Sequence, residues 1–92
     1  MPKHIVIVED ETALAENYKQ FLEKKGFAVS LYSNVASAKA AFEKQLPDLA
    51  ILDIELGHEI DGGFTLCQFL RQHSETLPIM FLTARDDEID AI

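Results

Sequence analysis

The stretch Ile5-Val6-Ile7-Val8-Glu9-Asp10 decides the fold, because it joins a short apolar run to a pair of acidic residues. Two later stretches repeat this design, since residues 49–53 read LAILD and residues 79–83 read IMFLT. Continuous apolar runs of this length are typical of strands that are covered on both faces of a parallel sheet. If the three runs lie side by side, their polar ends meet at one edge of the sheet. Open α/β sheets bind their ligands at such an edge.

Helical patterns separate the apolar runs. Asn34 is a good N-cap residue, Gly26 stands where a helix C-cap belongs, and Pro47 ends a helical pattern. The first helix is expected to carry one inward-facing stripe, which consists of Leu14, Tyr18, Phe21 and Leu22 with Lys25 at its end. The predicted helices are residues 12–25, 35–46 and 62–73, and a fourth would begin at Asp86 or Asp87.

Alternation of strands and helices predicts an α/β domain. The predicted strands are residues 3–8, 27–32, 48–53 and 79–83. Helices between parallel strands form right-handed crossovers and cover both faces of the sheet. The second strand alternates only partly, through Phe27, Val29 and Leu31, and is less strongly apolar than the others, so it is expected at an edge beside the first. The expected doubly wound sheet has the strand order 2-1-3-4, with its topological switch between strands one and three.

Composition fits one small domain and limits its partners. The 92 residues are 48% hydrophobic and 26% charged, with no linker that would divide them. The net charge of −8 argues against contact between this segment and nucleic acid. A single cysteine, Cys67, excludes an internal disulfide and fits a reducing compartment. The chain shows no membrane-span or signal-peptide pattern, so we expect a cytoplasmic location.

Acidic residues follow the strand ends at the predicted switch point. Asp53 can carry a phosphoryl group as an acyl phosphate, provided that a cation offsets its negative charge. Mg²⁺, or Mn²⁺ in its place, takes carboxylate, water and phosphate oxygens as ligands. We expect Asp10 and Asp53 to bind the cation directly and Glu9 to hold a metal-bound water. The backbone carbonyl of Glu55 lies just past the strand end in the sequence and is a further expected ligand.

Two small residues complete the predicted site. Thr83 is expected to donate a hydrogen bond to a phosphoryl oxygen, and Ala84 leaves room for the phosphoryl group to enter. Taken singly, the residues of the predicted site have simpler explanations. Residues 9–11 precede a helix N-terminus, where negative charge is favoured. Asp53 or Thr83 alone would suit a loop. Their joint occurrence on three strand ends is what indicates a phosphoryl acceptor.

Four segments together match a known pattern: residues 5–11 (IVIVEDE), 49–53 (LAILD), Asp61-Gly62 and 81–86 (FLTARD). In these segments the chain resembles the receiver domains of two-component response regulators. The separations of 43 positions from Asp10 to Asp53 and 30 from Asp53 to Thr83 also fit. The resemblance implies a flavodoxin-like fold and phosphoryl transfer from a sensor histidine kinase to Asp53. It further implies that Glu9 and Asp10 are the metal-binding acidic pair and that Thr83 is the switch hydroxyl.

Two features depart from the family pattern. Gly57 stands where receiver domains usually have proline, and Asp61-Gly62 comes one residue later than usual, so a longer loop is expected after Asp53. The sequence also stops within the predicted fourth helix, whereas receiver domains have five strands and five helices. We therefore expect residues 1–92 to form a receiver domain that is incomplete at its C-terminus, without the fifth strand, the lysine at its end, the aromatic switch residue and the last helix.

These departures lead to expectations about partners. Without a fifth strand, the fourth strand would present an exposed apolar edge, which favours pairing with a second copy of the chain. A homo-oligomer formed through this strand is therefore expected. The family also implies that a DNA-binding output domain follows in the parent protein, although nothing in these residues shows one.

Two other functions remain open. The first is a receiver-like module that signals through protein contacts without being phosphorylated. The second is a phosphatase, because Asp53-Ile54-Glu55 faintly resembles the nucleophile motif of haloacid-dehalogenase-like enzymes. In that family, however, the metal-binding acids come after the nucleophile, and the chain has no room for a substrate cap. We therefore expect a phosphoacceptor that assists its own phosphorylation and is not otherwise an enzyme.

Overall fold

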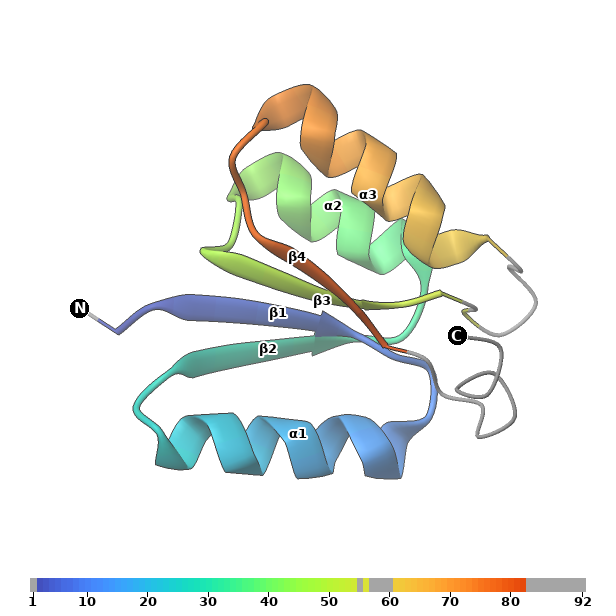
Figure 1. Cartoon of the computed structure of the whole chain (residues 1–92). Helices are drawn as coiled ribbons and strands as arrows, with labels where there is room; N and C mark the ends of the chain where they lie inside the picture. Colours follow the sequence, from blue (N-terminus) through green and yellow to red (C-terminus); the bar gives the residue numbers. More distant parts are fainter. Residues whose placement is uncertain (1, 55, 57–60, 83–92) are drawn as a thin grey trace, which may run out of the picture.

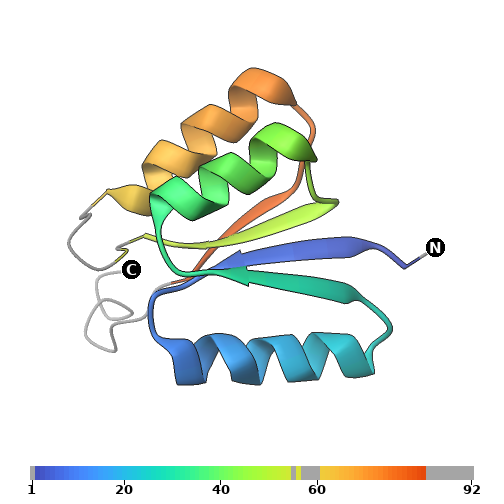
Figure 2. The ribbon, with the colours of Figure 1, turned by 180° about the vertical axis from the view of Figure 1, so that it is seen from behind.

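A parallel sheet between two layers of helices forms the domain. The computed structural model describes residues 2–54, 56 and 61–82. The strands are β1 (His4–Val8), β2 (Ala28–Tyr32), β3 (Leu49–Asp53) and β4 (Ile79–Leu82), and the helices are α1 (Thr12–Lys24), α2 (Val35–Lys44) and α3 (Gly62–His73). Figures 1 and 2 show α1 on one face of the sheet and α2 beside α3 on the other. The predicted fourth helix lies outside the described residues.

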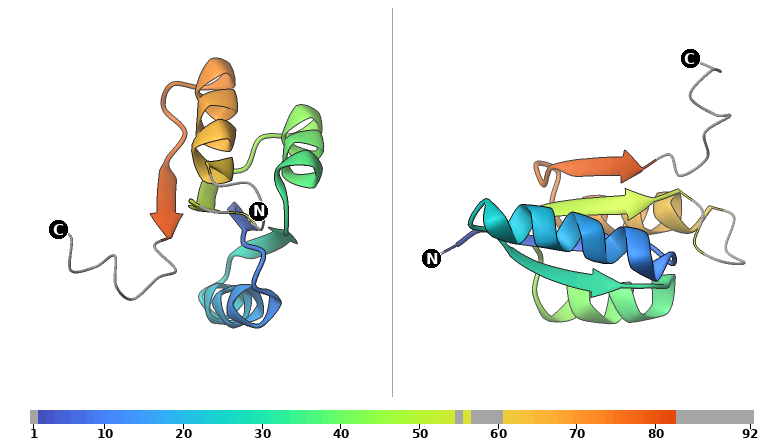
Figure 3. Two further views of the ribbon diagram at one scale, coloured as in Figure 1. Left: turned by 90° about the vertical axis from the view of Figure 1, so that its right-hand side faces the viewer. Right: turned by 90° about the horizontal axis from the view of Figure 1, so that it is seen from below.

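The sheet has the strand order β2-β1-β3-β4, and all its pairs are parallel. Ile5 of β1 lies opposite Val29 of β2 on one side and Leu49 of β3 on the other. The predicted order and the α/β fold class are therefore confirmed. Figure 3 shows the four strands running in the same direction, so their carboxyl ends gather at one edge.

Strand alternation divides the core between the two faces of the sheet. Successive strand residues point to opposite faces, so each strand supplies both layers. Toward α1 the buried side chains are Ile5, Ile7 and Ile51. Toward α2 and α3 the sheet buries Val6, Val8, Ala50 and Leu52, which pack against Ala38, Phe42, Leu66 and Leu70. Burial on both faces explains why β1 and β3 are continuously apolar in sequence.

Helix ends follow the predicted signals. The Asn34 side chain accepts a hydrogen bond from the Ser37 backbone N–H at 2.8 Å and so caps α2. Gly26 has a φ of 97°, a conformation that other residues rarely adopt, and it reverses the chain after α1. The chain can therefore enter β2 directly after α1.

The predicted inward stripe of α1 is wrong at one position. Phe21 is 59% exposed, whereas Tyr18 and Leu22 pack on the sheet and Ala15 is buried. Successive residues are about 100° apart around a helix, so the stripe centred on Ala15, Tyr18 and Leu22 leaves Phe21 at its margin. There the Lys25 ammonium group lies 5.3 Å from the centre of the Phe21 ring.

Strand β4 is only partly covered. Met80 is 54% exposed and Phe81 is 37% exposed, although both belong to an apolar strand. The helix α1 packs against β1 and β2, as the view in the right panel of Figure 3 shows, and β4 lies beyond it. In the part of the chain that the structure describes, β4 pairs with β3 alone.

Candidate functional site

The site lies where β1 and β3 end side by side. Val8 is paired with Leu52, so Glu9 and Asp53 emerge next to each other at the carboxyl edge of the sheet. From β1 the chain passes to β2 on one side, and it later returns to β3 on the other, which makes this edge the topological switch point. The predicted location of the switch is confirmed.

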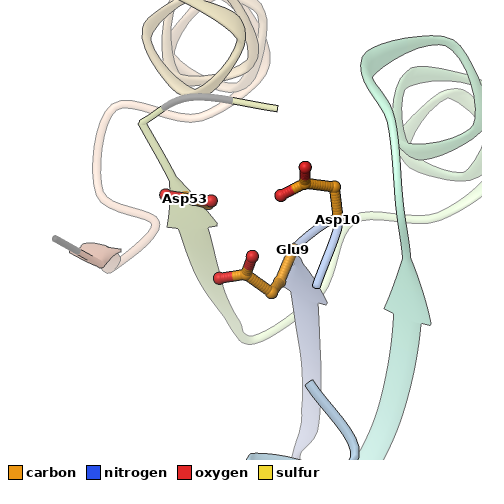
Figure 4. A group of neighbouring side chains, drawn as sticks. All are labelled: Glu9, Asp10 and Asp53. Atoms are coloured by element: carbon orange, nitrogen blue, oxygen red, sulfur yellow. The ribbon is translucent and has the colours of Figure 1, made fainter. Parts of the chain in front are cut away.

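Three carboxylates converge at this point. Glu9, Asp10 and Asp53 each offer one oxygen, and these oxygens all lie within 4.8 Å of one another. Figure 4 shows the Glu9 side chain directed toward Asp53, with the Asp10 carboxylate above it. Glu9 and Asp53 are each only 3% exposed, whereas Asp10 is exposed. The structure thus brings together the three acidic side chains singled out in the sequence.

Backbone hydrogen bonds fix Glu9 in place. Its N–H donates to the Tyr32 carbonyl at 2.9 Å, which ties the end of β1 to the end of β2. Its Oε2 accepts a hydrogen bond from the Glu11 N–H at 3.0 Å. The other oxygen, Oε1, is buried and has no hydrogen-bond partner among the residues described. A buried acceptor of this kind costs about 1–3 kcal/mol unless a proton or a cation satisfies it.

Burial also changes the acidity of Glu9. Removal of the carboxylate from water raises the pKa of Glu9 from its ordinary 4.5 to about 7, and the negative charge of Asp53 acts in the same direction. The hydrogen bond from Glu11 opposes the rise without cancelling it. Glu9 in the folded chain therefore keeps its proton to a higher pH than an ordinary glutamate does, as burial and a neighbouring carboxylate both favour the neutral form.

The donor set fits a hard divalent cation. All three side chains supply carboxylate oxygens, the ligands that Mg²⁺ and Mn²⁺ prefer. The unsatisfied Oε1 of Glu9 provides an acceptor that a cation, or a water bound to it, would complete. The exposure of Asp10 leaves the cluster open to solvent on one side.

The remaining predicted site residues, Glu55, Thr83 and Ala84, lie outside the residues that the structure describes. Asp53 is paired with Leu82, the residue that precedes Thr83 in the sequence.

One contact to the site was not predicted from the sequence. Gly63, in the first turn of α3, donates its N–H to the Ile54 carbonyl at 3.0 Å and approaches the backbone of Asp53 closely. The available signal was the second glycine of the Gly62-Gly63 pair. Glycine disfavours a helix, so its presence inside one calls for a packing reason.

None of the helices in the portion of the chain described by the structure has the length and apolar character needed to cross a membrane.

Sequence comparison identifies related proteins. The family model for the response regulator receiver domain matches residues 5–92. The regulatory protein VanRc of Enterococcus gallinarum is 39% identical over 92 residues, which cover 100% of this chain and 38% of that protein. The transcriptional regulatory protein CreB of Escherichia coli strain K12 is 37% identical over 86 residues, covering 94% of this chain and 37% of that protein. The chain thus spans about two fifths of the length of these curated relatives.

Comparison of structures agrees with the sequence. The non-phosphorylated receiver domain of HemR from Leptospira biflexa superposes with a TM-score of 0.80 at 28% identity. The match covers 99% of this chain and 73% of that one. Both the flavodoxin-like fold and the family resemblance seen in the sequence are confirmed. The chain belongs to the response regulator receiver domain family.

Proposed function

We propose that this domain accepts a phosphoryl group on Asp53 with the help of Mg²⁺, or Mn²⁺, held at the acidic cluster of Glu9, Asp10 and Asp53. The observation that carries the proposal is the convergence of these carboxylates at the switch point, with one buried oxygen left unsatisfied. Carboxylates held this close repel one another unless a cation or a proton compensates their charge. A purely structural loop has no need for such an arrangement.

Each residue of the cluster has a distinct role in this proposal. Asp10 and Asp53 bind the cation directly, Glu9 holds a metal-bound water, and the backbone carbonyl of Glu55 is a further ligand. When bound, the cation offsets the negative charge of the carboxylates and of the incoming phosphate. Burial of Asp53 limits the access of water to its carboxylate.

The proposed reaction is a transfer between a histidine and Asp53. A carboxylate oxygen of Asp53 attacks the phosphorus of a phosphohistidine on a sensor histidine kinase, and an oxygen–phosphorus bond forms. The nitrogen–phosphorus bond breaks, and its electron pair returns to the imidazole. Asp53 then carries an acyl phosphate. Thr83 donates a hydrogen bond to a phosphoryl oxygen and acts as the switch, and Ala84 leaves space for the group.

The proposal extends to the signalling context. Two-component response regulators couple a kinase to an output, and the domain acts as a signalling domain rather than as an enzyme that turns over substrate. The names of VanRc and CreB describe regulatory proteins, so we include control of transcription as the output. The net charge of −8 argues against direct contact between this segment and nucleic acid. The single cysteine supports a cytoplasmic location.

Intact mass spectrometry tests the acceptor. The chain is incubated with Mg²⁺ and a small phosphodonor, and we expect the mass of one added phosphoryl group. Asp53→Asn should remove the addition. The matched control is Asp48→Asn, which changes a carboxylate directly before the start of the same strand, where it accepts a hydrogen bond from the His4 N–H at 2.7 Å. Asp48→Asn should be phosphorylated like the unmodified chain.

A parallel melting experiment establishes that the site is formed. At ten times its dissociation constant, Mg²⁺ should add about 1.4 kcal/mol to the free energy of unfolding and raise the melting temperature. A folded chain that binds Mg²⁺ but gains no phosphoryl group would contradict the acceptor proposal. That result would favour the non-phosphorylated interaction module instead.

A further inference from the structure

Two adjacent glycines begin α3, and both are buried. Glycine in a helix is less favourable than alanine, so Gly62 and Gly63 together oppose the start of this helix. Neither has the positive φ that would require glycine for conformational reasons. The reason for their presence must therefore lie in what a side chain would touch.

At Gly63 a side chain would meet backbone. A Cβ atom there would overlap the carbonyl oxygen of Asp53 and would lie 2.9 Å from the Ile54 Cα. Backbone atoms of a central strand cannot rotate away, as the end of a side chain can. The Gly63 N–H uses this close approach to donate a hydrogen bond to the Ile54 carbonyl at 3.0 Å. The first turn of α3 therefore rests directly on the end of β3.

At Gly62 the surroundings are different. A Cβ atom there would lie 3.0 Å from Leu56 Cδ1 and 3.1 Å from both Leu56 Cβ and Val35 Cγ2, which are all side-chain atoms. These side chains would have to shift by a few tenths of an ångström to accept it, which is much less than the overlap at Gly63 requires. The two neighbouring glycines thus separate two effects, because the nearest atoms are backbone of the site at Gly63 and apolar side chains at Gly62.

We propose that Gly63 is a positioning residue for the acidic cluster. By allowing α3 to lie against the last residue of β3, it fixes the backbone that carries the Asp53 carboxylate relative to Glu9 and Asp10. The inference rests on the proposed function, because it assumes that these three carboxylates hold the cation. It adds a residue without any ligand atom to the requirements of the site.

A small displacement is enough to affect such a site. Ordinary contact with a Cβ atom requires 3.4–4 Å, so an alanine at position 63 would have to push the end of β3 or the start of α3 outward. Mg²⁺ demands near-octahedral geometry, and functional groups must be held to within about 0.5 Å to be effective. A shift on the order of 1 Å at Asp53 would therefore weaken cation binding even in a folded chain.

Mg²⁺ titration calorimetry on three chains tests the inference: the unmodified chain, Gly63→Ala and Gly62→Ala. All three are measured in the same concentration of trimethylamine N-oxide, which favours the folded state, and folding is checked by circular dichroism. We expect the Mg²⁺ affinity of Gly63→Ala to be at least roughly tenfold lower than that of the unmodified chain. Losses of this size are typical when residues that orient metal ligands are changed. Gly62→Ala, which also adds one methyl group to the same helical turn, should retain the affinity of the unmodified chain.

The outcomes are distinguishable. If the unmodified chain does not bind Mg²⁺, the proposed function fails. If it binds Mg²⁺ and Gly63→Ala binds equally well, the positioning role of Gly63 is overturned while the proposed function stands. Equal losses in both variants would also overturn it, because the effect would then come from the core. A Gly63→Ala chain that stays unfolded in the osmolyte would overturn it as well, since glycine would then be required for the whole fold rather than for the site.

Discussion

Glu9 combines burial, crowding and an unsatisfied oxygen, and this combination gives the domain a characteristic pH dependence. In the unfolded chain its carboxyl group ionises near the ordinary pKa of 4.5, whereas in the folded chain burial raises the pKa to about 7. Between these values the folded state keeps a proton that the unfolded state has lost. Without a cation, the contribution of Glu9 to the free energy of unfolding therefore falls as pH rises from about 4.5 to about 7 and stays low above that range.

Glu9→Gln should remove this dependence, because glutamine does not titrate. One unit of pKa difference corresponds to about 1.4 kcal/mol, so we expect a loss on the order of 1–3 kcal/mol that is specific to Glu9. Urea unfolding in a chelator at roughly pH 5 and pH 8 measures it. Glu23→Gln on the exposed side of α1 is the control and should behave like the unmodified chain. An unchanged pH profile in Glu9→Gln would contradict the prediction.

At the residue scale, the sequence predicts that Glu9, Asp10 and Asp53 come together but not how each is held. The positions of Glu9, Asp10 and Asp53 follow from strand periodicity, because a residue that ends a buried strand must lie at the sheet edge. The different exposures of Glu9 and Asp10 depend on how tightly β2 and α1 pack around them. The contact of Gly63 with the Asp53 backbone joins segments that only the folded chain brings together, so strand and helix patterns do not reveal it.

Among the elements, the connection from α3 to β4 is held by side-chain hydrogen bonds, most of them from Arg71. Arg71, in the last turn of α3, donates from Nη1 to the Leu77 carbonyl at 2.6 Å and to the Ser74 and Glu75 carbonyls at 3.3 Å each. These carbonyls belong to the segment that turns the chain back toward the sheet. A cation at the C-terminus of a helix also interacts favourably with the helix dipole.

Arg71→Met keeps the apolar stem but removes the donors. Hydrogen bonds to charged groups are worth about 1.5–3 kcal/mol when buried, and this side chain is exposed, so we expect a loss of about 1 kcal/mol. Urea unfolding measures the change. Gln72→Met, which alters the adjacent exposed position, should leave stability nearly unchanged. Equal stability of Arg71→Met and the unmodified chain would show that the carbonyls are satisfied equally well by water.

Several element boundaries were predictable because local signals agree with the fold. Asn34 marks the start of α2, Gly26 follows the end of α1, and the apolar runs form strands. The prediction that α2 runs to residue 46 is wrong, because the helix ends at Lys44 and Gln45 is already extended. The exposure of Phe21 was not predicted, and the reason is physical. Residues at spacings of three and four form a stripe on the helix that is wider than the face in contact with two strands. Spacing alone does not indicate which margin of the stripe lies over the sheet.

At the scale of the whole molecule, exposed apolar side chains lie on both faces of the sheet at the β4 edge. Phe64 and Phe81 lie on the face of α2 and α3 and are 46% and 37% exposed, and Met80, which is 54% exposed, lies on the opposite face. The rings of Phe64 and Phe81 are 5.1 Å apart and tilted by 53°. Within the described segments β4 pairs on one side only, and an exposed apolar strand edge favours pairing with another chain.

The 92-residue chain is therefore expected to self-associate at concentrations on the order of tens of micromolar. Sedimentation velocity measures this directly. Met80→Lys should shift the chain toward monomer, because a charge at a strand edge opposes pairing. Phe21→Lys is the matched control, since it removes an equally exposed apolar side chain from α1, and it should leave association unchanged. A monomer at all concentrations would contradict the prediction.

The pairing of β1 with β3 also determines when the acidic cluster can form during synthesis of the chain. Asp10 and Asp53 are 43 positions apart, and the segment between them includes α1, β2 and α2, so it must be synthesised before β3 can pair with β1. A nascent chain that has emerged only as far as α2 has Glu9 and Asp10 but no Asp53. Loop closure over this separation must come first, so the three carboxylates exist as a group only once the central pair of strands has assembled.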